Sequence, residues 1–96
     1  MESKKLPDSS FEESLKSDII FNSGDRKIVQ LRMKKDAILP DHHSPVDTCL
    51  LVIQGEICFN MGGKDYLLSE NMFLNFLAME KHSVKCIEDS VFLLYR

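Results

Sequence analysis

Histidine is the residue type in this 96-residue chain best suited to chemistry near neutral pH, and the chain contains three of them. His42 and His43 are adjacent and stand shortly before a strongly apolar stretch, whereas His82 begins a later stretch of alternating residues. An imidazole nitrogen can transfer a proton or bind a transition metal. Asp41, His42 and Ser44 do not predict a catalytic triad, because neighbours in the sequence rarely provide its geometry.

The apolar stretch after the first two histidines covers residues 48–53 and predicts a buried strand. It is too short for a helix, and turn-forming residues flank it on both sides. Successive side chains of the strand point to opposite faces. If the chain is also extended before the strand, His42 lies on the same face as Thr48, whereas His43 lies on the opposite face. We expect the face that carries Thr48 to line a pocket with His42, Ser44 and His82 at one end. The predicted lining residues are Ser44, Thr48, Leu50 and Val52.

The rest of the chain predicts further short strands separated by turns at intervals of about eight to twelve residues. In the strand over 27–33, alternation directs Gln30 and Arg32 outward. Turns are expected at 54–55 and 88–90, and a loop is expected to carry His42. This pattern is typical of an all-β barrel or jelly roll. The remaining predicted strands are 19–21, 56–61, 64–68, 72–77, 82–87 and 91–95.

Residues 1–18 form a polar N-terminal segment ahead of a domain over 19–96. Ser10 and Glu13 fit the spacing of a helix capping box, and Phe11 and Leu15 form an apolar pair four residues apart. One or two helical turns are therefore predicted over 9–16.

Composition indicates a small single domain of the cytoplasm. The chain has 12 basic and 15 acidic residues without a basic stripe, so we expect no nucleic-acid partner. We expect no membrane span and no signal peptide, because no apolar stretch is long enough. The cysteines lie within apolar strand patterns without metal-type spacing, which predicts buried reduced thiols. They are Cys49, Cys58 and Cys86.

Two segments resemble the paired motifs of the cupin superfamily. In that pattern a glycine is followed after five residues by His-x-His, then by a glutamate and, six residues later, by a glycine. A second motif ends in a further histidine. The resemblance covers roughly residues 27–95. The spacing of the motif positions agrees with the cupin pattern better than the residue types at those positions do. His42, Gly55 and His82 match the pattern, whereas its other positions hold Asp36, Ser44, Thr48 and Glu70.

The resemblance implies a double-stranded β-helix that could hold a divalent metal such as Zn, Fe, Mn or Ni through His42 and His82. His43 is a candidate third ligand. Because Ser44 and Thr48 replace the family's histidine and glutamate, we expect a degenerate metal site.

The resemblance also implies a homodimer that binds a small molecule or acts as a non-enzymatic regulatory module. The alternative is a metal-dependent oxygenase or isomerase that uses His42 and His82. Several large apolar residues could fill the barrel or form a dimer face. They are Met61, Met72, Phe73, Phe76 and Met79.

Overall fold

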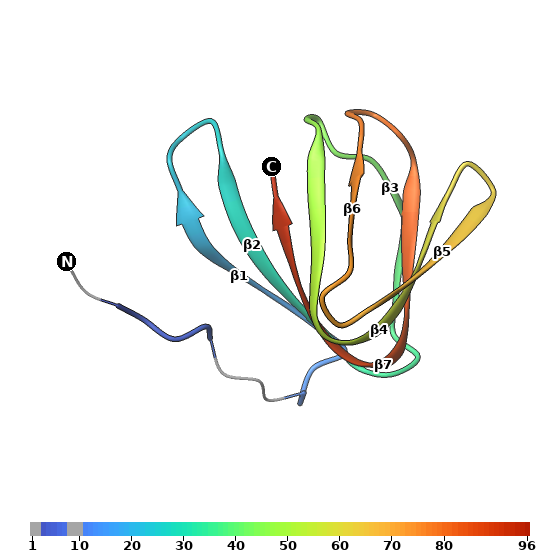
Figure 1. Cartoon of the computed structure of the whole chain (residues 1–96), viewed down its shortest axis with the longest axis horizontal. Helices are drawn as coiled ribbons and strands as arrows, with labels where there is room; N and C mark the ends of the chain where they lie inside the picture. The colour runs from blue at the N-terminus through green and yellow to red at the C-terminus, as the bar shows by residue number, and fades with distance from the viewer. Residues whose placement is uncertain (1–2, 8–10) are drawn as a thin grey trace.

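The structure, a computed structural model, describes residues 3–7 and 11–96, and its regular elements are all β-strands (Figure 1). Across these residues it contains no helix with the length and apolarity needed to traverse a bilayer. The all-β prediction is therefore confirmed. The strands are β1 (Leu15–Asn22), β2 (Lys27–Met33), β3 (Ile38–His42), β4 (Thr48–Met61), β5 (Lys64–Ser69), β6 (Phe73–Phe76) and β7 (His82–Tyr95).

Two long strands, β4 and β7, build the barrel by pairing with each other over their whole length. All pairings are antiparallel, in the order β1-β2-β7-β4-β5, with β3 added to β7 and β6 added to β4. The second half of β7 pairs with β2 and with the first half of β4, which also pairs with β6. The first half of β7 pairs with β3 and with the second half of β4, which pairs with β5. One pair of strands thus contributes to two layers, as a jelly roll requires.

The predicted turns at 54–55 and 88–90 are wrong, because β4 and β7 continue through them. The pairing between the two strands shifts register between Val52 and Ile57, where β4 passes from one layer to the other. Gly55 has φ of 84° there, and a Cβ on it would overlap the Asp89 carbonyl oxygen and the Ser90 hydroxyl. Ser90 Oγ donates to the Glu56 carbonyl oxygen at 3.1 Å. The turn-forming residues therefore make a corner within continuous strands.

The N-terminal helix prediction is wrong for the part that the structure describes. Residues 11–14 are not helical, and β1 already begins at Leu15. Ser9 and Ser10 lie outside the described residues. The histidine loop was also predicted wrongly in part, because His42 ends strand β3.

The core fills the space between the two layers with apolar side chains. Strands β2, β4 and β7 supply most of them, and Phe76 of β6 joins them. Met61 packs against this core, whereas Met72, Phe73 and Met79 are exposed. The fully buried members are Met33, Val52, Ile57, Phe59, Cys86 and Phe92.

Gln30 and Arg32 were expected to face solvent, but they are 1% and 2% exposed. The prediction that they lie on the face of β2 opposite the core is correct, because they alternate with the core residues Val29, Leu31 and Met33. The N-terminal residues cover them instead of water. The Pro7 carbonyl accepts hydrogen bonds from both side chains, and the Arg32 guanidinium lies 5.9 Å from the centre of the Phe11 ring.

Candidate functional site

His42 and His82 meet at one end of the barrel interior. They are paired residues of the β3–β7 ladder, and their ring centroids are 4.1 Å apart with the planes inclined at 67°. Residues 43–81 separate them in the sequence, so only this pairing brings them together. The structure places His43 on the surface instead, where it is exposed.

Each ring is oriented by a carbonyl two residues earlier in the chain. Nδ1 of His42 lies 2.8 Å from the Pro40 oxygen, and Nδ1 of His82 lies 2.9 Å from the Glu80 oxygen. A carbonyl only accepts, so each Nδ1 carries a hydrogen, and in the neutral form of either ring Nε2 keeps a lone pair. Burial lowers the pKa of His82 below the ordinary value, while its bond to Glu80 opposes this effect.

Aromatic side chains fill the space in front of these rings. The centroid of His82 lies 5.2 Å from that of Phe59 and 4.4 Å from that of Phe76. The cavity that remains beside His42 and His82 has a volume of about 10 Å³. That is enough for about one water molecule.

The two alcohols at the family's ligand positions bind each other. Ser44 and Thr48 are buried, and Thr48 Oγ1 lies 3.2 Å from Ser44 Oγ and 3.1 Å from the Val46 carbonyl oxygen. Of the predicted pocket residues, Leu50 lines the small cavity, whereas Val52 is packed in the core. The predicted face therefore exists, but the hydroxyl groups of Ser44 and Thr48 at its polar end are already hydrogen-bonded within the chain.

Two loops close this end of the barrel. The Met79 amide donates to the Ser44 carbonyl oxygen, and the Ala78 amide donates to Asp47 Oδ1, each at 2.8 Å. Met79 has φ of 67°, an uncommon conformation for a residue with a long side chain. Asp47 is exposed and holds this loop.

These donors do not fit a tightly held metal. A catalytic site normally uses three protein ligands, and the pair offers two neutral nitrogens. Within residues 3–7 and 11–96, no group of three His, Cys, Asp or Glu side chains could surround an ion. The hydroxyls that replace the missing ligands are poor donors for transition metals.

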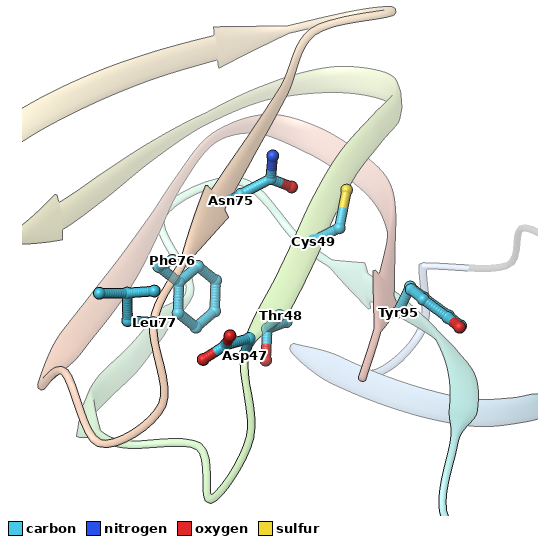
Figure 2. A pocket seen from close by; sticks show the side chains of 7 residues that line it. All are labelled: Asp47, Thr48, Cys49, Asn75, Phe76, Leu77 and Tyr95. Atoms are coloured by element: carbon cyan, nitrogen blue, oxygen red, sulfur yellow. The ribbon is translucent and has the colours of Figure 1, made fainter.

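A larger hollow lies where the start of β4 meets the ends of β6 and β7, which flank it (Figure 2). It has a volume of about 300 Å³. No local pattern in the sequence indicates it, because its residues come from three separate segments. They are Asp47, Thr48, Cys49, Asn75, Phe76, Leu77 and Tyr95. The aromatic packing on His82 was missed for the same reason, because Phe59 and Phe76 reach it through pairings far apart in the chain.

No family model and no curated protein matches the sequence. Solved structures do match. A cupin superfamily protein from Desulfitobacterium hafniense is similar with a TM-score of 0.86, 16% identity and coverage of 99% of this chain and 91% of that chain. KdgF from Halomonas sp. is similar with a TM-score of 0.81, 20% identity and coverage of 93% of this chain and 84% of that chain.

The cupin domain of an XRE family transcriptional regulator from Enterobacter cloacae is similar with a TM-score of 0.76, 14% identity and coverage of 86% of this chain and 95% of that chain. These three proteins share the fold of this chain at low identity. The resemblance that the histidine spacing suggested is thereby confirmed at the level of architecture: this chain has the cupin fold.

Proposed function

We propose that this chain is a non-enzymatic cupin-fold module that acts through its surfaces and assembles as a homodimer. The observation that carries the proposal is the cavity of about 10 Å³ beside His42 and His82. A drug-sized ligand needs a pocket of at least about 300 Å³. Similarity to the cupin domain of a transcriptional regulator supports a regulatory role. We place the protein in the cytoplasm, since its three cysteines are free.

A small molecule could still bind to this module, and the hollow at the ends of β4, β6 and β7 has room for one. Its walls combine the Tyr95 ring and Leu77 with the polar groups of Asp47 and Asn75. Binding there would leave the histidine pair untouched, in agreement with a role that does not use the barrel interior.

The second candidate function is a metal-dependent enzyme of the oxygenase or isomerase kind. The two Nε2 lone pairs favour it, because the tautomers leave both of them free to bind an ion. It requires the remaining ligands to be water molecules, and Phe59 and Phe76 leave little room for them.

Elemental analysis of protein purified without a metal-affinity tag separates the two functions. We expect substoichiometric Zn, Fe, Mn and Ni, and the same content in a His42→Ala, His82→Ala double variant. A His43→Ala variant is the matched control, because His43 is exposed. Near-stoichiometric metal that disappears only in the double variant would overturn the proposal in favour of the enzyme.

A further inference from the structure

We propose that two copies of this chain join through the free edges of β1, which pair antiparallel about a two-fold axis at Ser17. The proposal deepens the homodimer of the preceding subsection and rests on it only for the existence of a dimer. Figure 1 shows β1 at the outer end of the sheet. Within the described residues, β2 is its only strand partner.

Within the described residues, the straight part of β1 has a row of backbone groups that bond to no other segment. Its pairing with β2 is regular from Leu15 to Ile19 and shifts register after that. The Lys34 amide donates to the Ser14 oxygen, so Ser14 lies at a hydrogen-bonded position of the ladder. These positions alternate, so the backbone groups of Lys16 and Asp18 face β2. The groups that face away from β2 belong to Leu15, Ser17 and Ile19.

The sequence of this straight part is complementary to itself. An antiparallel copy centred on Ser17 places Lys16 opposite Asp18 of the second copy, and Leu15 opposite Ile19. The two-fold axis repeats both contacts. Each strand thus brings an apolar pair on one face and an opposite-charge pair on the other.

Across the β1–β2 ladder, neither Lys16 nor Asp18 has a residue of opposite charge as its partner. Lys16 is directly opposite Arg32 in the β1–β2 ladder, which places two positive charges side by side. Asp18 is half-buried and lies opposite Gln30, an uncharged residue. A second copy would give Lys16 a carboxylate and Asp18 an ammonium group.

The apolar side of the strand also favours a partner. Ile19 is 58% exposed, although it lies in a strand and on the face that packs Leu15 against the core. An exposed edge strand with apolar side chains is a template for pairing with another chain. The pairing would cover Ile19 with Leu15 of the second copy and join the two sheets into one.

Sedimentation equilibrium of the full chain tests the interface. We expect a wild-type dimer, and a Lys16→Glu variant with a dimer dissociation constant at least about tenfold higher, because it sets two carboxylates against each other twice. This variant should fold well, since the introduced carboxylate would face Arg32. A Lys16→Asp, Asp18→Lys double variant restores the opposite charges and should regain most of the affinity.

A Ser17→Pro variant supplies the independent measurement. Proline removes an amide hydrogen that faces away from β2, so the monomer should keep its circular dichroism while the dimer is lost. A wild-type chain that stays monomeric at about millimolar concentration would overturn both the interface and the homodimer. A dimer that survives both Lys16→Glu and Ser17→Pro would overturn this interface alone. Failure of the charge-swapped variant to regain affinity would overturn the proposed register.

Discussion

At the scale of single residues, the environment of His82 is that of a side chain packed in the core. The ring keeps its place in the ladder and its bond to the Glu80 carbonyl, but Phe59 and Phe76 surround it. A buried imidazole is disfavoured in its charged form, and this is the main reason that the pKa of His82 is lowered. The residue therefore serves the fold as a neutral aromatic ring.

This environment predicts how stability depends on pH. The pKa of His82 in the folded chain lies below the ordinary value of 6.5, so the unfolded chain takes up the proton first as pH falls. The contribution of His82 is fully present above pH 6.5 and is lost as pH falls through the lowered pKa. Urea unfolding should give a smaller free energy of unfolding at about pH 5.5 than at about pH 7.5.

The matched variants assign that effect to one ring. His82→Phe keeps an aromatic side chain among Phe59 and Phe76 and should reduce the difference between the two pH values. His43→Ala changes an exposed histidine and should leave the difference as it is in the wild-type chain. Equal pH dependence in the wild-type and His82→Phe proteins would contradict the prediction.

At the scale of elements, the corner shared by β4 and β7 decides how the layers are arranged. Gly55 lets the backbone pass at φ of 84° with no side chain between it and Ser90. Any Cβ would meet both an unfavourable conformation and an occupied space. The glycine that the cupin pattern requires at this position therefore has a steric reason here.

A Gly55→Ala variant should lower the free energy of unfolding by roughly 3 kcal/mol or more, since strain and overlap add. Gly24→Ala is the control, because Gly24 also has a positive φ, of 90°, but nothing lies within 4 Å of an added Cβ. Its cost should be about 1 kcal/mol, the conformational part alone. Denaturant titrations compare the two, and equal losses would show that the corner is not tightly packed.

The elements also show which properties of the fold could be predicted from the sequence. Alternation is local, so the burial of Thr48, Leu50 and Val52 was predicted correctly. The continuity of β4 and β7 depends on pairing between distant segments, and local turn residues indicated the opposite. Strand β3 contains Pro40 and Asp41, which weaken a strand signal, and it forms because β7 pairs with it.

The candidate site was predictable only in outline. The spacing of the cupin pattern indicated that His42 and His82 lie together, and they do so because strands β3 and β7 pair at these two positions. The filling of the cavity by Phe59 and Phe76 depends on side chains from four strands and had no local signal. The cover over Arg32 likewise comes from residues more than twenty positions earlier.

At the scale of the whole molecule, the short chain limits the stability that one core can supply. A domain of 96 residues buries only roughly 60–65% of the surface of its extended chain. Association through β1 would add apolar contact and hydrogen bonds that the single chain lacks. Folding and assembly are then linked by mass action.

The melting temperature should therefore rise with protein concentration, by roughly 3 °C for each tenfold increase. Lys16→Glu should remove most of this dependence, because its dimer is weaker. Differential scanning calorimetry at three concentrations measures both proteins. A melting temperature independent of concentration in the wild-type chain would contradict the linkage.

Strand β7 lies between β2 and β4 in one layer and between β3 and β4 in the other, yet it follows all of them in the sequence. A nascent polypeptide on the ribosome can form the β1–β2 and β4–β5 hairpins before β7 has emerged. These hairpins remain unconnected at that stage, because β7, which pairs with both, is translated after them. The native sheet should accordingly be completed only after β7 has left the exit tunnel, and until then the apolar faces of the earlier strands are exposed to chaperones.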